Sequence, residues 1–128
     1  MNQDNSDLNH LAESWIADWE LRHPDNERPE ASDSVDKVSH FHLDEEHDAL
    51  WKFILATYRK PMSPRVFAIL AAGPLEDLLA SFGPEYIDRV ETLARQDPKF
   101  KELLGGVWKN AITDDVWERL GRVRGSTW

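Results

Sequence analysis

The stretch that decides the fold is residues 61–83, Pro-Met-Ser-Pro-Arg-Val-Phe-Ala-Ile-Leu-Ala-Ala-Gly-Pro-Leu-Glu-Asp-Leu-Leu-Ala-Ser-Phe-Gly. Ser63 before Pro64 is typical of an N-cap residue followed by the first residue of a helix. From Val66 to Ala72 the chain is almost wholly apolar, which is too uniform for a surface helix. So short an apolar run is also compatible with a buried strand. Its three alanines and its proline start favour a buried helix.

Two Gly-Pro pairs, ten residues apart, divide this stretch further. Glycine is enriched where helices end and proline where they begin, so Gly73-Pro74 and Gly83-Pro84 each predict a sharp corner between two helices. At the first corner a left-handed stop residue is expected, and a β-branched side chain at Gly73 should then damage folding. Beyond it, Glu76 and Asp77 fall on a different face from the apolar residues.

The rest of the chain also has helical periodicity, and no segment alternates convincingly as a strand does. Apolar residues at intervals of three and four predict an amphipathic helix that begins at Ser6 and ends before Pro24. Residues 37–43 alternate weakly, as a short extended piece does. Further helices are expected before Pro61 and from Pro84. Asp97 is expected to cap a helix that begins at Pro98, and Thr113 to cap the last helix. We therefore predict an all-α fold, with residues 1–128 in one compact bundle of roughly six to eight helices.

Composition places the chain among soluble globular proteins, with 128 residues, 41% hydrophobic and 30% charged. The absence of cysteine excludes disulfides, thiolate metal sites and cysteine nucleophiles. The first residues are polar and acidic, unlike a signal peptide, and no apolar run reaches the roughly 18 residues of a membrane helix. We expect a cytoplasmic protein with no cofactor and no membrane partner, in which residues 1–5 are disordered and 24–36 form an acidic loop.

Acidity is concentrated in the first half of the chain. The net charge is −9, and residues 1–50 contain 14 Asp and Glu against 3 Lys and Arg. Such a surface repels nucleic-acid phosphates, so no direct nucleic-acid partner is expected. It suits a basic protein partner, or it only keeps the protein soluble. Under the partner hypothesis the contact residues are Asp18, Trp19, Glu20, Asp44, Glu45, Glu46 and Asp48.

Three blocks are distinctive: Gly-Pro-Leu-Glu-Asp-Leu-Leu from residue 73, Ala-Arg-x-Asp-Pro-x-Phe from residue 94 and Gly-Gly-Val-Trp from residue 105. Over residues 50–124 they resemble a family of small bacterial proteins, a domain of unknown function. The resemblance implies membership and no activity. Their apolar positions fall at helical spacing, which favours a shared structural motif over a shared active site. The motif residues are Gly73, Pro74, Glu76, Asp77, Gly83, Pro84, Gly105, Gly106 and Trp108.

Two groups of residues are candidates for chemistry. Glu76 and Asp77 can act as acid and base or hold a cation. As first-turn residues they can instead satisfy free helix amides, or accept a hydrogen bond from the indole N–H of Trp108. His40 and His42, with His47 nearby, are weak candidates for Zn²⁺ ligands. Their structural alternative is an acidic helix start with incidental histidines.

No nucleophile motif, P-loop or dinucleotide fingerprint occurs, so no catalytic residue is assigned. We expect a protein-binding module, in its concrete form an immunity-type inhibitor of a basic toxin or nuclease. One alternative is a metal-dependent enzyme that uses Glu76 and Asp77 or the histidine cluster. The other is a structural or oligomeric subunit. Because the chain has six tryptophans, any exposed one is a candidate contact.

Overall fold

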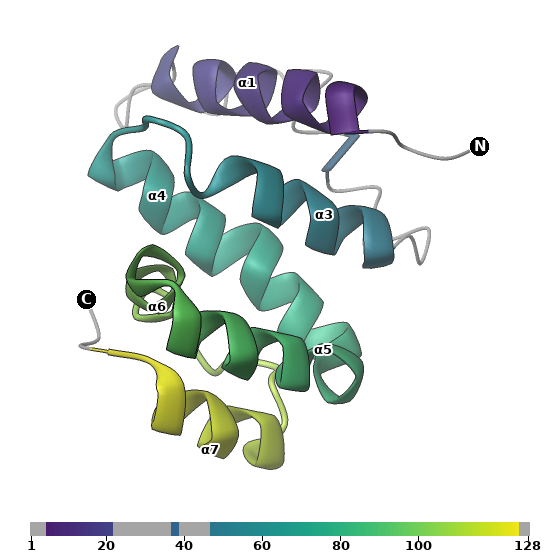
Figure 1. The fold of residues 1–128 in the computed structure, drawn as a ribbon, viewed down its shortest axis with the longest axis vertical. Helices are drawn as coiled ribbons and strands as arrows, with labels where there is room; N and C mark the ends of the chain where they lie inside the picture. The colour runs from purple at the N-terminus through teal and green to yellow at the C-terminus, as the bar shows by residue number, and fades with distance from the viewer. Residues whose placement is uncertain (1–4, 22–36, 39–46, 126–128) are drawn as a thin grey trace.

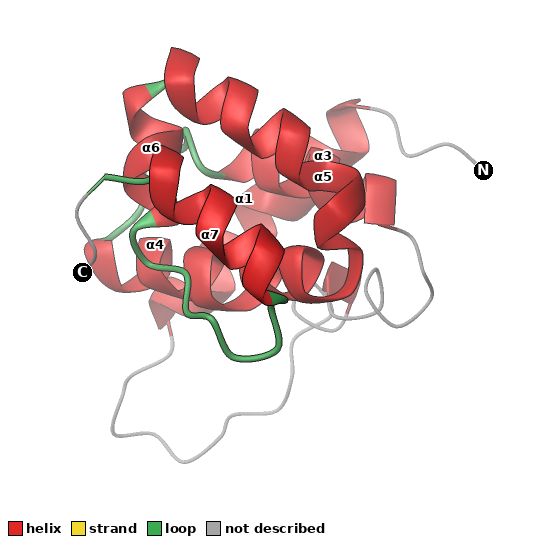
Figure 2. Cartoon of the chain, turned by 90° about the horizontal axis from the view of Figure 1, so that it is seen from below, coloured by secondary structure: helices red, strands yellow, loops and turns green. Residues whose placement is uncertain are grey.

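The computed structural model describes residues 5–21, 37–38 and 47–125, and these form helices and loops without a strand (Figures 1 and 2). The all-α prediction is confirmed for this part of the chain. The elements are α1 (Asn5–Leu21), α3 (His47–Thr57), α4 (Pro64–Leu70), η1 (Ala71–Leu75), α5 (Glu76–Gln96), α6 (Pro98–Leu104) and α7 (Asp114–Val123).

Over the described residues the helix count is lower than the six to eight expected, because α4, η1 and α5 follow one another without a loop, Pro64–Gln96, although α5 kinks at Phe82. Apart from Lys37 and Val38, the described residues therefore make five continuous helical segments. Lys37 and Val38 are helical, so the extended piece expected there is wrong for these two residues. The predictions for residues 1–4, 24–36 and 39–43 lie outside the described residues.

The first Gly-Pro pair does not end a helix. The chain passes through η1, a π-helical turn with Pro74 inside it. Proline lacks an N–H and its ring clashes with a regular α-helix, and the wider π-turn relieves that conflict. Gly73 does not have a positive φ. The predicted corner and the predicted left-handed stop at Gly73 are therefore wrong.

The second Gly-Pro pair does change the direction of the chain. Phe82 has φ −132° and ψ 22° inside α5, and the helix kinks there. Beyond the kink, α5 turns back below its first part toward α6 (Figure 1). Gly83 is buried, and a Cβ atom built on it would lie 3.0 Å from Cγ2 of Val116. The missing side chain therefore lets α7 pack closely against the kink.

One hydrophobic core connects all the described helices. Trp15 of α1 packs edge-on against Phe53 of α3 at 5.6 Å between ring centroids. Phe100 of α6 contacts Tyr58 and Trp51 in the same manner, at 5.3 and 6.0 Å. α1 lies over α3 at one end of the molecule and α7 lies against α5 at the other, so both terminal helices bury apolar faces.

Among the predicted helix caps, Ser63 and Asp97 act through their side chains. Ser63 Oγ accepts from the N–H of Val66 at 3.2 Å. Asp97 Oδ1 accepts from the N–H of Lys99 at 3.0 Å. Thr113 occupies the N-cap position of α7 without a side-chain hydrogen bond to the helix. The sequence rules for Ser-Pro and Asp-Pro starts therefore hold here, since these contacts are local.

One described helical stretch, Pro64–Gln96, is long and apolar enough to cross a membrane by length and composition alone. Half of its apolar window is buried inside the protein. A core helix of a soluble protein passes the same test, so this finding carries no argument about localisation.

Candidate functional site

Trp108 stands out among the described side chains because it is large, apolar and exposed. It is 65% exposed, and in the described part of the chain only Leu21 is a more exposed large hydrophobic residue. Trp15 and Trp51 are buried, and Trp19 and Trp117 are partly buried against the core. Exposed indoles on a folded protein are candidate contacts for another molecule.

Burial and hydrogen bonds hold the loop that carries Trp108, residues 105–113. We call it the Trp108 loop. Val107 and Ile112 are 4% and 2% exposed on either side of the tryptophan. The main-chain N–H of Val107 donates to the carbonyl of Leu104 at 3.2 Å, and that of Ile112 donates to Lys109 at 2.6 Å. The backbone on both sides of Trp108 is therefore fixed by burial and by hydrogen bonds.

Glu76, the first residue of α5, fixes the tip of the Trp108 loop. Its Oε1 accepts from the main-chain N–H of Trp108 at 3.0 Å, and its Oε2 accepts from Nδ2 of Asn110 at 2.8 Å. Asn110 has φ 33°, in the left-handed region that asparagine tolerates better than most residues. The sequence suggests a hydrogen bond from the indole N–H of Trp108, whereas Glu76 accepts from its main-chain N–H, and the indole extends from a backbone that is already ordered.

Three acidic residues are sequence neighbours of the Trp108 loop or of Glu76, which binds the loop. Asp77 follows Glu76, and Asp114 and Asp115 begin α7; all three are exposed. Lys109 is the one basic residue within residues 105–113, and its Nζ lies 2.7 Å from Oδ1 of Asp114. The hydrogen bond from Lys109 lowers the pKa of Asp114. The exposed residues that directly follow Glu76 and the Trp108 loop in the chain are therefore acidic.

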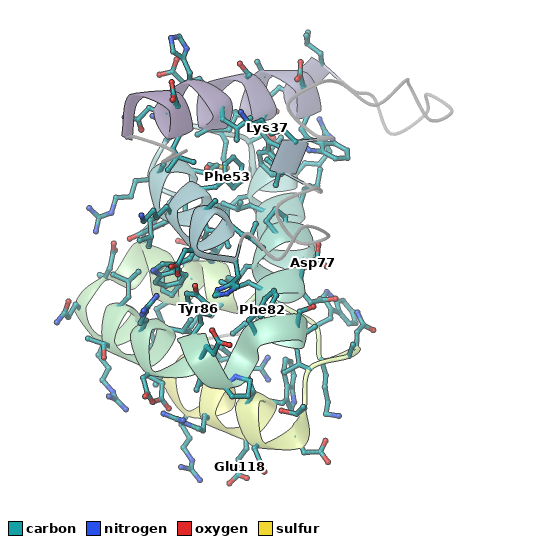
Figure 3. All side chains as sticks on the ribbon, turned by 90° about the vertical axis from the view of Figure 1, so that its right-hand side faces the viewer. Lys37, Phe53, Asp77, Phe82, Tyr86 and Glu118 are labelled. Carbon is teal, nitrogen blue, oxygen red and sulfur yellow. The ribbon has the colours of Figure 1, made fainter. Side chains whose placement is uncertain are left out.

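A cavity of about 130 Å³ lies where α1, α3, α4 and η1 meet. We call it the η1 cavity. Asp77 is the charged residue among its lining side chains in the described chain (Figure 3). Asp77 directly follows Glu76, so the start of α5 connects the η1 cavity with the Trp108 loop. The lining residues are Trp15, Trp19, Val38, Leu50, Ile69, Gly73, Pro74 and Asp77.

The predicted contact residues on α1 serve internal contacts. Glu20 accepts from both the N–H and Oγ of Ser63, at 2.8 and 2.7 Å, and these hydrogen bonds lower the pKa of Glu20. The carbonyl of Trp19 accepts from Nη2 of Arg65 at 2.5 Å. The Trp19 ring packs 6.2 Å from that of Trp15, while Asp18 is partly buried. Glu20 and Trp19 thus fasten the end of α1 to the start of α4.

Asp48, the last predicted contact residue within the described chain, binds Tyr86. The buried Tyr86 hydroxyl donates to Oδ1 of Asp48, which lowers the pKa of Asp48. Burial, followed by this hydrogen bond, raises the pKa of Tyr86. Nη1 of Arg89 lies 3.6 Å from the same carboxylate oxygen of Asp48. The predicted contacts Asp44, Glu45 and Glu46 lie outside the described residues.

His47 is the histidine of the predicted metal cluster that the structure describes. Its Nδ1 lies 2.8 Å from the Tyr86 hydroxyl oxygen, and its ring lies 4.5 Å from that of Phe82 (Figure 3). His40 and His42 lie outside the described residues. Within the described chain, no three His, Asp or Glu side chains gather as a metal site would require. The zinc prediction has no supporting geometry in this part.

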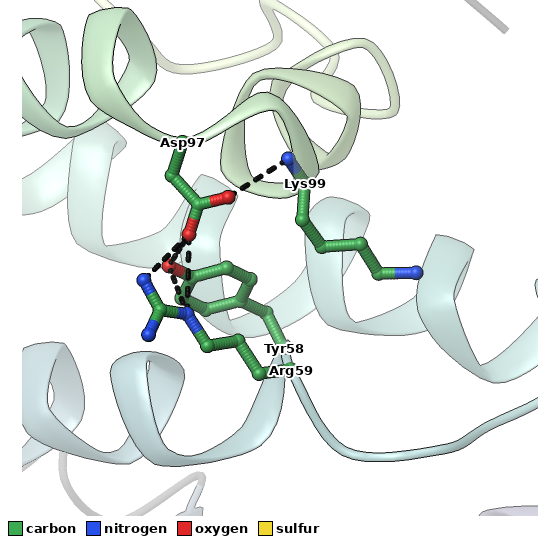
Figure 4. Close-up of polar contacts among 4 residues, drawn as sticks. All are labelled: Tyr58, Arg59, Asp97 and Lys99. Atoms are coloured by element: carbon green, nitrogen blue, oxygen red, sulfur yellow. Dashed lines mark hydrogen bonds and ion pairs between the residues drawn. The ribbon is translucent and has the colours of Figure 1, made fainter.

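A polar cluster around Asp97 was not predicted from the sequence (Figure 4). Oδ2 of Asp97 accepts from the Tyr58 hydroxyl at 2.5 Å and from Nη2 of Arg59 at 2.7 Å. These two hydrogen bonds, in that order, lower the pKa of Asp97 to about 2. The cluster joins the end of α3 to the junction of α5 and α6. Only the Asp-Pro cap was visible in the sequence, because the partners are distant along the chain.

A family model described as a family of unknown function, DUF6869, matches residues 22–127. The match begins well before residue 50, where the resemblance began, and it includes the Trp108 loop and most of the η1 cavity. α1 precedes the matched residues, so Trp15 and Trp19 enter the cavity from outside them. No curated protein and no solved structure matches the chain.

Proposed function

The chain belongs to the DUF6869 family and, because that family is of unknown function, we propose from the surface geometry that the protein is a protein-binding module. Its concrete form is an immunity-type inhibitor that blocks a basic protein such as a toxin or a nuclease. The observation that carries the proposal is Trp108, 65% exposed on a loop whose backbone is already fixed.

Fixing the loop before binding favours a tight contact. Association must offset the entropy of ordering side chains and loops, and a loop that is already ordered avoids part of that loss. Tryptophan is among the residues most often found as binding hot spots, since its indole buries a large area with few rotatable bonds. Glu76 and the buried Val107 and Ile112 supply this order in the unbound protein.

A basic partner fits the charge of the molecule. The net charge is −9, Asp114 and Asp115 directly follow the Trp108 loop in the chain, and Asp77 follows Glu76, which binds that loop. Charge complementarity of this kind raises association rates and excludes partners of like charge. The proposed contact surface therefore centres on the Trp108 loop rather than on α1, where Trp19 and Glu20 make internal contacts. We place the complex in the cytoplasm as part of this proposal.

The test is capture from native lysate with four baits: the wild-type protein, Trp108→Ala, Leu21→Ala and Asp115→Asn. Leu21 is the matched control, because it is 78% exposed and lies on α1, at the opposite end of the molecule from α7 (Figure 1). We expect one basic protein retained by wild type and by Leu21→Ala, weakened by Asp115→Asn and by salt, and lost with Trp108→Ala. The purified partner should then lose its activity when the wild-type protein is added.

Two outcomes contradict the proposal. Equal capture of the same protein by wild type and Trp108→Ala removes the role of the indole. A concentration-dependent dimer in light scattering, abolished by Trp108→Ala, assigns the surface to self-association, as in the structural-subunit alternative. Circular dichroism of each variant shows that its helices are intact.

A further inference from the structure

Gly73, within the π-turn, lines the η1 cavity. Apart from its chain neighbours and the backbone of its own helix, a Cβ atom at Gly73 would have no heavy atom within 4 Å, whereas one at Gly83 would meet Val116 at 3.0 Å. The space beside Gly73 is therefore open, and the cavity that Gly73 lines has a volume of about 130 Å³. π-turns inside α-helices occur frequently at functional sites. The two glycines thus have different packing, and only Gly73 faces open space.

The lining of the cavity has a defined chemistry. Two indoles, Trp15 and Trp19, and the apolar side chains of Val38, Leu50 and Ile69 form its walls. The exposed carboxylate of Asp77 is on its lining. Pro74 has no N–H, so the carbonyls of Ile69 and Leu70 receive no hydrogen bond from it. The walls therefore favour a flat or apolar group, and the carboxylate favours a cation.

A guanidinium group satisfies both requirements. It is planar, it stacks on aromatic faces, and its N–H groups pair with a carboxylate. It is less strongly hydrated than an ammonium group, which eases its transfer into an apolar cavity. Its size also fits, because an apolar cavity of about 150 Å³ holds one benzene molecule. A carboxylate ligand would be repelled by Asp77 and by the net charge of −9.

We infer that the η1 cavity binds an arginine side chain of the basic partner, with the guanidinium between the indoles and Asp77. This inference rests on the proposed function and adds a specific residue class to it. Asp77 and Glu76 are consecutive, and Glu76 holds the Trp108 loop. One partner surface can therefore place an apolar patch on Trp108 and an arginine in the cavity.

The first test needs no partner. The purified protein is titrated with N-acetyl-arginine amide while the indole N–H signals of its tryptophans are followed by NMR. N-acetyl-citrulline amide has nearly the same shape without the charge and serves as the ligand control. We expect saturable shifts of the Trp15 and Trp19 signals with arginine amide, and affinity at least tenfold lower for citrulline amide and for the Asp77→Asn variant.

The second test fills the cavity. Gly73→Leu places a side chain in the open space, and we expect it to abolish arginine-amide binding. Gly121→Leu is the matched control, because Gly121 is also helical and also has no atom within 4 Å of a Cβ position. Asp115→Asn controls for loss of a surface charge. Neither control should change the binding of arginine amide, and thermal melts should show that all three variants fold.

The outcomes separate this inference from the proposed function. Equal binding of arginine and citrulline amides, or unchanged binding in Gly73→Leu, overturns the arginine site and leaves the Trp108 surface standing. Retention of the captured basic partner by Gly73→Leu at wild-type affinity also overturns it. If the protein binds arginine amide but captures no partner in a way that depends on Trp108, the proposed function is overturned instead.

Discussion

The two Gly-Pro pairs have the same sequence and opposite structural effects. At Gly73-Pro74 the helix continues through a π-turn beside a cavity, and at Gly83-Pro84 it kinks at Phe82 against α7. The difference lies in what surrounds each glycine. A Cβ atom would have open space at Gly73 but would lie 3.0 Å from Val116 at Gly83. The dipeptide permits a break in the helix, and packing from distant segments determines whether the chain changes direction.

The largest expected effect comes from adding a side chain at the crowded glycine. Gly83→Leu would force Val116 and α7 away from α5, and we expect it to lower the free energy of unfolding by about 3 kcal/mol. Urea denaturation followed by circular dichroism measures this change. Gly83→Ala should cost less, and Val116→Ala should recover part of that loss in a double-mutant cycle. Additive effects of the two substitutions would contradict close packing at the kink.

The next largest effect is expected at the contact between the end of α3 and Asp97, which follows the C-terminal end of α5. Tyr58→Phe removes the hydroxyl that donates to Asp97, and we expect a loss of about 1.5 kcal/mol at pH 7. Arg59→Lys is a milder companion, because Arg59 is 67% exposed. Urea midpoints for the two variants should rank in that order. A larger loss for Arg59→Lys would show that the ion pair outweighs the buried hydroxyl.

The Asp97 cluster also predicts a pH dependence. The folded-state pKa of Asp97 is about 2, below its ordinary value near 4. A depressed carboxylate pKa gives stability that is complete above the unfolded-state pKa and is lost as pH falls through the folded-state pKa. Wild-type stability should therefore decline between about pH 4 and pH 2, and more steeply than that of Asp97→Asn. Parallel curves for the two proteins would exclude this role for Asp97.

Sequence reasoning succeeded where the cause of a structure is local. Ser63-Pro64 and Asp97-Pro98 begin helices because each cap bonds within its own turn. It failed where the cause is tertiary. Val116, which explains the crowding at Gly83, lies in a different helix, and no local pattern indicates that contact.

The candidate site shows the same limit. The Gly-Gly-Val-Trp block indicates Trp108 as a motif residue, and the sequence suggests a hydrogen bond from its indole N–H to Glu76 or Asp77. The exposure of the indole and the use of its main-chain N–H depend on how the loop lies against α5. Trp19 is also a candidate contact in the sequence, yet α1 lies on the core and half-buries it. The η1 cavity could not be predicted, because Gly73-Pro74 indicated a corner.

A smaller effect is expected at Glu76, which lies two residues after Pro74 and binds the Trp108 loop. Glu76→Gln turns one acceptor oxygen into an NH₂ group that faces a donor, so one of the two loop contacts is lost. We expect about 1 kcal/mol less stability and faster hydrogen exchange of the Trp108 main-chain N–H. Asp77→Asn, one residue along α5, should leave that exchange rate unchanged. Equal exchange in wild type and Glu76→Gln would mean that the loop is held without the carboxylate.

The smallest effect is a gain in stability at the open glycine. Gly73→Ala adds a methyl group with no atom within 4 Å outside its chain neighbours and its own helix backbone, and Gly73 does not have a positive φ. Alanine restricts the unfolded chain more than glycine does, but its Cβ meets the ring of Pro74, so we expect a gain of at most about 0.5 kcal/mol. Gly121→Ala in α7, which precedes no proline, is the control and should gain about 1 kcal/mol. A loss of stability in Gly73→Ala together with a gain in Gly121→Ala would show that the π-turn itself requires glycine. The contrast between the two Gly-Pro pairs would then rest on backbone conformation at Gly73-Pro74 and on packing at Gly83-Pro84.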